Sequence, residues 1–182
     1  STDISYGIEV DGAGNVFLTG ETNSANFPVL SPFQATNGGA TDVFVTKLNP
    51  TGTGLLFSTY IGGTGNEHGR GICLSATGEI YITGETFSAN YDVTAGAYQT
   101  VNGGGFPDAF VTKLNSSGST LAYSTFLGRA SNDYGRAIKV NASGNAFAAG
   151  YTFSANFPVT AGVVQTVHAG GVYDIYVTQL NA

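Results

Sequence analysis

One nine-residue phrase occurs three times in this chain and limits the folds open to it. GETNSANFP begins at residue 20, GETFSANYD at 84 and GYTFSANFP at 150, so the copies lie 64 and 66 residues apart. A second phrase, DVFVTKLN, begins at 42 and returns as DAFVTKLN at 108 and DIYVTQLN at 174, 66 residues apart both times. The 182 residues hold about 2.75 copies of one unit, and such a fixed period indicates a repeat architecture.

Each unit contains four short runs with the pattern of β-strands. In the copy that begins at residue 42 they are DVFVTKL, LLFSTYIG at 55–62, RGICLS at 70–75 and EIYITGE at 79–85. The first run alternates with period two, and the second is rich in aromatic and β-branched residues. Connections such as NPTGTG and SATG are typical of hairpin turns. No window has the periodicity of an amphipathic helix, so we expect an all-β fold of four-stranded antiparallel meanders.

A four-stranded antiparallel meander repeated head to tail is the blade of a β-propeller. A β-solenoid usually has shorter coils, and tandem sandwiches need more strands per unit. The phrase order DAFVTKLN…STFLG…NDYGRAIKVNASGNAFAAGYTFSANFP resembles the bacterial β-propeller repeat called SBBP, and the resemblance covers essentially the whole chain. It implies a propeller fold and a place in large secreted or cell-surface proteins, but it implies no particular activity.

The repeat predicts a single β-propeller-type region over residues 1–182. We expect a partial blade plus crossover at 1–41, whole blades plus crossovers at 42–107 and 108–173, and the first strand of a further blade at 174–182. A propeller needs at least about four blades to close, so these blades are predicted to be open. The chain is then either a fragment of a longer protein or a subunit whose ends a neighbouring chain completes. Open strand edges favour pairing with other chains.

The amino-acid composition limits the classes of partner that the protein can bind and indicates where it is located. Charged residues make up only 10%, against the roughly 25% usual in soluble proteins, while 42% are hydrophobic. The net charge is −6 and the 6 Lys and Arg residues are scattered, which argues against nucleic-acid binding. No apolar run approaches the roughly 20 residues of a membrane span, so we expect no membrane insertion. A Gly-rich chain with so few charges fits a secreted or bacterial cell-surface module.

Long connecting segments fall on one predicted face of the blades, at 86–107 and 62–71, and recognition residues concentrate in such loops. Asp42, Asp108 and Asp174 each follow a Gly-rich turn and open the strand that we expect to line the central channel. Carboxylates around a channel mouth would suit a cation or a polar ligand. The alternative is that each Asp accepts hydrogen bonds from turn amides.

A second candidate set lies on the same face. An acidic residue and an arginine three positions apart suit a polar ligand, and the pattern occurs twice. An alternative is that each arginine pairs with the channel-side aspartate and pins one loop to the next. The first copy has Tyr6 at the arginine position, so the set is not strictly repeated. Its members are Asn66, Glu67 and Arg70, and Asn132, Asp133 and Arg136.

No metal or cofactor site is predicted. The calcium-loop pattern D-x-[DN]-x-[DN]-G is absent, and neither His68 nor His168 recurs in the other copies. Cys73 aligns with charged residues, Lys139 and Glu9, so we expect its side chain on the wetter side of a blade.

Catalysis is not expected either. Glu21 and Glu85 both follow the fourth predicted strand, and paired carboxylates are what glycoside hydrolysis requires, but the third copy has Tyr151 there. Enzymes normally break repeat symmetry with unique catalytic residues, and none with a credible partner stands out.

We therefore expect a non-catalytic structural scaffold or protein-interaction platform, in a multisubunit or filamentous assembly, with protein partners or other copies bound through open blade edges. One alternative is a carbohydrate-binding module that binds glycans through the long-loop face. The repeated aromatics Phe44, Phe110 and Tyr176 would stack on sugars in that case, whereas in a scaffold they pack between blades. A further alternative is a fragment of a propeller enzyme whose site lies elsewhere.

Overall fold

The computed structural model describes residues 1–181. Within that range the chain forms eleven β-strands and no helix, so no helix there is long and apolar enough to cross a membrane. The all-β expectation is confirmed. The strands are β1 (Asp3–Val10), β2 (Val16–Thr22), β3 (Asp42–Leu48), β4 (Leu55–Ile61), β5 (Glu67–Leu74), β6 (Ile80–Thr86), β7 (Asp108–Leu114), β8 (Leu121–Leu127), β9 (Asp133–Val140), β10 (Ala146–Thr152) and β11 (Asp174–Leu180).

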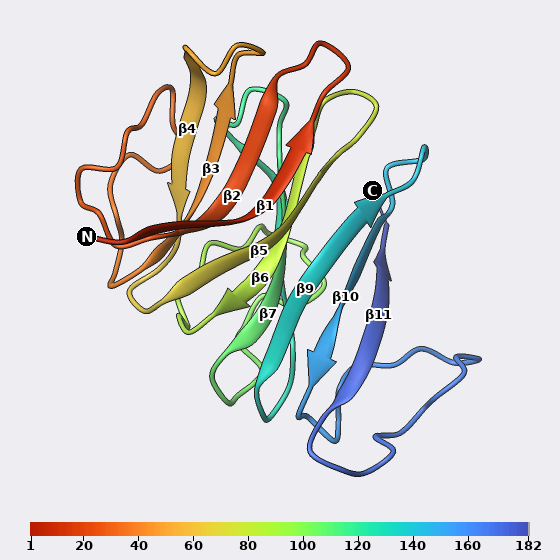
Figure 1. Cartoon of the computed structure of the whole chain (residues 1–182). Coiled ribbons are helices and arrows are strands. Elements are labelled where there is room, and N and C mark those ends of the chain that lie inside the picture. Colours follow the sequence, from red (N-terminus) through yellow and green to blue (C-terminus); the bar gives the residue numbers. More distant parts are fainter. Residues whose placement is uncertain (182) are drawn as a thin grey trace.

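The strands build three separate antiparallel sheets in sequence order. The first sheet contains β1 to β4, the second β5 to β8, and the third β9 to β11. The sheets lie side by side as blades, and their first strands β1, β5 and β9 run next to one another in the middle of the molecule (Figure 1). Two complete meanders and one of three strands agree with the predicted 2.75 open propeller blades.

The predicted blade boundaries at 42–107 and 108–173 are wrong by two strands. The strand before the repeated phrase pairs with the strand after the long loop, with Gly20 opposite Phe44 and Gly84 opposite Phe110. The long loops 23–41 and 87–107 therefore connect strands of one sheet, and short links at 62–66 and 128–132 join neighbouring sheets. A repeat period is the same whichever strand is counted first, so the period alone did not fix where a blade begins.

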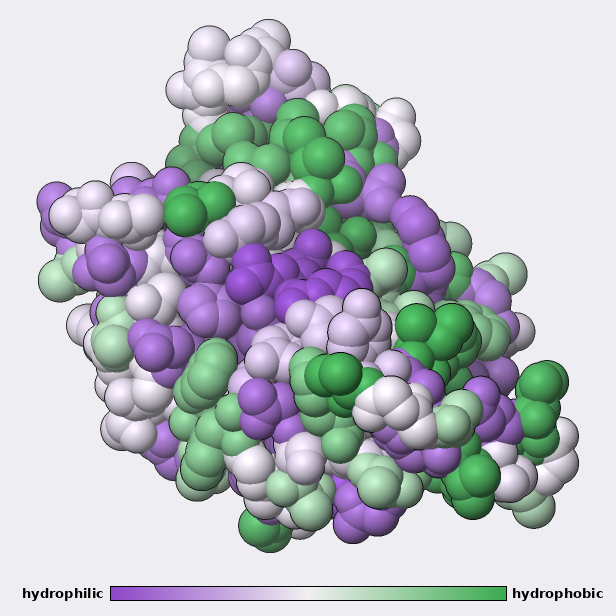
Figure 2. Space-filling model, turned by 60° about the horizontal axis from the view of Figure 1, so that its bottom comes forward, coloured by the Kyte–Doolittle hydropathy of each residue, from purple (hydrophilic) through white to green (hydrophobic). Residues whose placement is uncertain are grey.

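The long loops and the short inter-sheet links lie at the same end of the strands, as predicted. Thr41, at the end of one long loop, forms a parallel bridge with Asn66 in the adjacent link. Tight turns occupy the opposite end, where the amide of Asn15 bonds to the Asp11 carboxylate at 2.9 Å. Figure 2 turns the long-loop end forward, with strongly hydrophilic side chains gathered near the middle of the view.

The core lies between the sheets, because each blade buries one face against the next. The repeated aromatics pack there, and Phe44, Phe110 and Tyr176 are at most 7% exposed. Burial of one such side chain is worth roughly 1.5–3 kcal/mol. The first junction contains Phe17, Val43, Val45, Phe57, Ile61, Ile72, Ile80, Ile82, Tyr91, Phe110, Leu114 and Phe126, and the second contains Cys73, Tyr81, Ala109, Val111, Leu127, Ile138, Ala146, Ala148 and Tyr176.

The phrase GETFSANYD forms a joint, but one that acts within a sheet. Ser88 accepts a hydrogen bond from the Gly65 amide at 2.7 Å, which ties the long loop to the inter-sheet link. Tyr91 is 2% exposed, its ring centroid lies 4.8 Å from that of Phe110, and its hydroxyl is 3.0 Å from Thr112 Oγ1. The aromatic residue therefore anchors the start of the loop on the third strand of its own blade.

Candidate functional site

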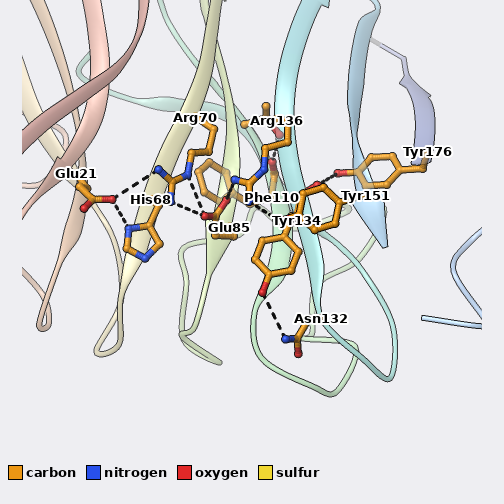
Figure 3. A network of polar contacts seen from close by, with 11 residues as sticks. Glu21, His68, Arg70, Glu85, Phe110, Asn132, Tyr134, Arg136, Tyr151 and Tyr176 are labelled. Carbon is orange, nitrogen blue, oxygen red and sulfur yellow. Dashed lines mark hydrogen bonds and ion pairs between the residues drawn. The ribbon is translucent and has the colours of Figure 1, made fainter. Parts of the chain in front are cut away.

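A β-bulge on the first strand of each sheet sets the position of the arginines. The ladder between β5 and β6 shifts between Gly69 and Gly71, and Arg70 is the extra residue; Arg136 has the same place on β9. A bulge bends the strand and re-aims its extra side chain. Both arginines therefore reach toward neighbouring strands at the centre of the molecule (Figure 3).

Glu85 on β6 lies between the two arginines and joins the second sheet to the third. Its Oε1 accepts hydrogen bonds from Arg70 Nε at 2.9 Å and Nη2 at 2.8 Å, and its Oε2 accepts one from Arg136 Nη1 at 2.8 Å. The Glu85 side chain is only 3% exposed. Burial alone would lower the pKa of Arg70, but the interactions with Glu85, together with those with Tyr6, raise that pKa above its ordinary value. Two cations on one buried carboxylate fit a structural clamp.

The same clamp is repeated one blade earlier. Glu21 on β2 lies 2.5 Å from His68 Nδ1 and 3.9 Å from Arg70 Nη1, so it joins the first sheet to the second. The Arg70 guanidinium lies 4.1 Å from the centroid of the Tyr6 ring. On the third sheet, Tyr151 replaces the glutamate and accepts a hydrogen bond from Arg136 at 2.8 Å. The polar network thus runs through both junctions and ends in a tyrosine at either side.

These contacts correct the sequence interpretation of the arginines. We expected each arginine to bind a polar ligand or to pair with the channel-side aspartate. Arg70 and Arg136 instead pair with Glu21 and Glu85, which lie on the second strand of a blade. Glu21 and Glu85 both contact Arg70, which lies between them (Figure 3).

A separate acidic pair lies at the long-loop end of the first junction. Asp42 is fully buried and accepts hydrogen bonds from Gly38 N at 2.8 Å and Gln34 Nε2 at 2.7 Å. Glu67, also fully buried, accepts one from Gly63 N at 2.8 Å. A Cβ on Gly62 would lie 2.6 Å from Asp42 Oδ1 and 2.7 Å from Glu67 Oε2, so both carboxylates close on this glycine. Burial, and then the charge of Glu67, raises the pKa of Asp42 to about 6.

The second junction repeats this arrangement with Asp108 and Asp133. Asp108 accepts a hydrogen bond from Gly103 N at 2.6 Å, and Asp133 accepts bonds from Arg129 N at 2.7 Å and Ser154 Oγ at 2.9 Å. Burial raises the pKa of Asp108 to about 7, and the neighbouring Asp133 charge adds to the effect. Oδ1 of Asp108 has no hydrogen-bond partner in the described chain, and the same holds for Asp42.

The aspartates therefore act as the turn-amide alternative predicted, and their expected position beside a central channel is wrong. They open the third strand of each sheet, while the first strands occupy the centre. Asp42 and Asp108 are 0% exposed, so neither offers an oxygen to a ligand in solution. Asp174 is partly exposed and accepts bonds from Ala169 N at 2.6 Å and Gln165 Nε2 at 2.9 Å.

The remaining candidates do not gather into one site. Asn66 is exposed in the link between the first and second sheets, and the Asn132 side chain lies 3.4 Å from the Tyr134 hydroxyl. His168 lies 3.7 Å from Asp174, far along the chain from His68. No cluster of three or more metal-ligating side chains occurs in residues 1–181.

Cys73 is a further correction, because it is 2% exposed and not on the wetter side of its blade. It packs with Tyr81, Val111 and Ile138 where the third sheet covers the second. Burial raises the pKa of the thiol to about 12, which disfavours the reactive thiolate form. At the equivalent positions of the other two sheets, Lys139 Nζ and Glu9 Oε2 lie 3.3 Å apart.

Sequence reasoning missed the polar network as a unit. A pattern across the repeats indicates it: the second strands carry Glu21, Glu85 and Tyr151, and the bulges carry Tyr6, Arg70 and Arg136. When the second strand of one sheet is compared with the bulge of the next sheet, Glu21 corresponds to Arg70 and Glu85 corresponds to Arg136.

Residues 1–28 match the family model SBBP, described as a beta-propeller repeat. The match covers β1, β2 and the start of the long loop, the segment that recurs at 65–92 and 131–158 in this chain. No curated protein matches the chain. A repeat family identifies a building unit and not a catalytic activity. The chain thus carries, at residues 1–28, a β-propeller repeat of the SBBP family.

Proposed function

We propose that this chain is a non-catalytic interaction module of a secreted or cell-surface protein, and that copies associate head to tail through the open faces of the first and third sheets. In this arrangement the β1 face of one copy covers the β11 face of another. The contact would repeat the geometry of the two internal junctions. A heterologous contact of this kind builds rings or filaments.

The observation that carries the proposal is the exposure of equivalent residues. Ile8 is 66% exposed, while its counterparts Ile72 and Ile138 are 6% and 3% exposed. At the other end Val177 is 73% exposed, whereas Val45 and Val111 are at 0%. Ile175 is 83% exposed where Val43 and Ala109 are at 0%. Each open face therefore presents apolar side chains that a neighbouring sheet covers elsewhere in the same molecule, and such patches mark interaction sites.

The polar residues at the two ends favour a second copy as the partner. Inside the chain, a glutamate on one sheet meets an arginine on the next. At the open ends both charges are absent, because the third sheet carries Tyr151 in place of glutamate and the first carries Tyr6 in place of arginine. A head-to-tail contact thus brings Tyr151 and Tyr6 together and leaves no glutamate or arginine of this network unpaired at the junction, where a buried unpaired charge would be costly.

The mass of the native protein tests the proposal. In sedimentation experiments, the average molar mass of the wild-type species is expected to increase with protein concentration. Ile8→Asp and Val177→Asp each place a charge on one open face and should give monomers. Val101→Asp is the control, because Val101 is 71% exposed in a loop outside both faces and its substitution should leave the mass unchanged.

Two results would overturn the proposal. One is a wild-type protein that stays monomeric at every concentration. The other is association that persists in the Ile8→Asp and Val177→Asp variants or is lost equally in the control.

A further inference from the structure

We propose that each of the two internal junctions is held closed by one proton, which two buried carboxyl groups from neighbouring sheets share, and that loss of this proton loosens the link between the sheets. We call each pair of acids with its link a junction latch. The inference goes beyond association between copies, because both latches lie inside the molecule. The first latch is Asp42, Glu67 and the link 62–66, and the second is Asp108, Asp133 and the link 128–132.

The two carboxyl groups of a latch face each other across one glycine. A Cβ on Gly128 would lie 2.5 Å from Asp108 Oδ1 and 2.7 Å from Asp133 Oδ2, and the first latch closes on Gly62 in the same way. All four acids are 0% exposed, and no cation of residues 1–181 forms an ion pair with any of them. Two adjacent buried charges of the same sign are costly, so each pair favours the uptake of a proton.

In each latch the acid on the first strand of a sheet is the ionised partner. Glu67 accepts the Thr86 hydroxyl on Oε1 and the Gly63 amide on Oε2, each at 2.8 Å. Hydrogen bonds donated to both oxygens stabilise the carboxylate form. Asp133 also accepts on both oxygens, and its donors are Thr152 Oγ1, Ser154 Oγ and Arg129 N.

The acid on the third strand of a sheet is the protonated partner. The donors to Asp42 and Asp108 reach Oδ2 only, as Gly38 N does at 2.8 Å and Gly103 N at 2.6 Å. Oδ1 of both aspartates has no hydrogen-bond partner in the described chain and faces the ionised acid across the glycine. A proton on Oδ1 therefore removes the repulsion within the pair. Burial, as the first cause, raises the pKa of Asp42 to about 6 and that of Asp108 to about 7, which agrees with this position of the proton.

The other titratable groups around the latches keep one charge state in this pH range. Tyr60 and Tyr91 face the first latch and Tyr176 faces the second, and burial raises the pKa of each of these tyrosines, so all three stay neutral. Arg129 in the second link stays protonated, and its charge lowers the pKa of Asp108 by less than burial raises it. The acid pairs therefore set the pH dependence of the junctions.

Hydrogen bonds connect the acids of a latch to both sides of its link. At the first latch, Gly63 N donates to Glu67 at 2.8 Å, and Gly62 N donates to the side chain of Gln34 at 2.9 Å. The same Gln34 side chain donates to Asp42 at 2.7 Å. Because the two acids belong to neighbouring sheets, repulsion between two carboxylates acts on the link that these bonds hold.

The direction of the pH effect follows from proton linkage. The closed latch holds a proton up to the raised pKa of its aspartate, whereas an aspartate in an opened, hydrated link has its ordinary pKa of about 4. Opening therefore becomes easier as the pH rises from about 4 to the pKa of the closed state, and it changes no further above that value. The junctions are closed in acid and looser at neutral pH.

Amide hydrogen exchange, compared between variants at each pH, measures opening of the links. In the wild type, protection of 128–132 relative to the middle of β6 should fall by up to about tenfold per pH unit from about pH 5 to about pH 7, and then level off. Asp108→Asn puts an amide hydrogen in place of the shared proton, so protection of 128–132 should no longer depend on pH. Residues 62–66 should still lose protection in that variant, up to the pKa of Asp42 at about 6. Asp42→Asn should give the reciprocal result.

Asp174→Asn is the control, because Asp174 also accepts turn amides but is partly exposed, and both links should behave as in the wild type. Carboxyl-carbon NMR titration of the wild type tests the latch without any variant, and Asp42 and Asp108 should titrate near 6 and 7. Three results would overturn the latch. They are ordinary pKa values of about 4 for both aspartates, an unchanged pH dependence of 128–132 in Asp108→Asn, and links that close only when calcium ions are added.

Discussion

Strands β7 and β11 have nearly the same sequence, DAFVTKL and DIYVTQL, and very different surroundings. Every residue of β7 is buried, whereas β11 has only Tyr176 buried. β7 has β8 on one side and the third sheet over its face, and β11 has neither in the described chain. Burial in this molecule is therefore a property of the stack of blades and not of the strand sequence.

The largest expected effect comes from placing a charge at equivalent positions of these two strands. Val111→Asp buries an unpaired carboxylate between the second and third sheets and should cost at least about 3 kcal/mol of unfolding free energy. Val177→Asp changes the same residue where it is 73% exposed and should stay within about 0.5 kcal/mol. Urea unfolding of both variants measures the difference. Equal losses would mean that the two strands share one environment.

The glutamate clamps should differ in the same direction. Glu85→Gln leaves Arg70 and Arg136 without their shared, 3% exposed carboxylate and should cost about 2 kcal/mol. Glu21→Gln acts at a side chain that is 16% exposed and should cost about 1 kcal/mol. Denaturant unfolding at neutral pH gives both values. A larger loss for Glu21→Gln would contradict a network centred on Glu85.

The acidic pairs predict a pH dependence with a definite sign. The folded-state pKa of Asp108 is raised to about 7, so the folded state binds more protons than the unfolded state. Stability from this group is present at low pH and is lost as the pH rises through about 7. Asp108→Asn should therefore flatten the fall in unfolding free energy and gain about 1–2 kcal/mol at alkaline pH relative to the wild type. Unfolding curves across the pH range measure this, and an unchanged slope would contradict it.

The sequence was enough to predict the β-strands but not which strands belong to the same sheet. Alternating residues and Gly-Asn turns predict the strands of DVFVTKL and LLFSTYIG because these patterns are local. The sheet boundary depends on pairing between Gly20 and Phe44 across a loop, which no local pattern encodes. The long loop suggested a crossover between blades, whereas its backbone bonds at Leu30 hold it on its own sheet.

The candidate site was predicted in part for a similar reason. The turn-amide role of Asp42 follows from its neighbours in sequence, Gly38 among them. The clamp at Glu85 joins residues from two sheets, with Arg136 51 positions away. Cys73 is likewise buried by residues of the third sheet, and the sequence of its own strand does not predict that contact.

Cross-linking between single-cysteine faces tests head-to-tail association most directly. Ile72 and Val45 pack in one cluster at the first junction, and Ile8 and Val177 are their counterparts at the open ends. A mixture of Ile8→Cys and Val177→Cys proteins, treated with a short bifunctional maleimide, should give a heterodimer, while neither variant alone should cross-link. Cys73 is buried with its pKa raised to about 12 and should not compete. Homodimers of either variant, or no cross-link in the mixture, would contradict the account.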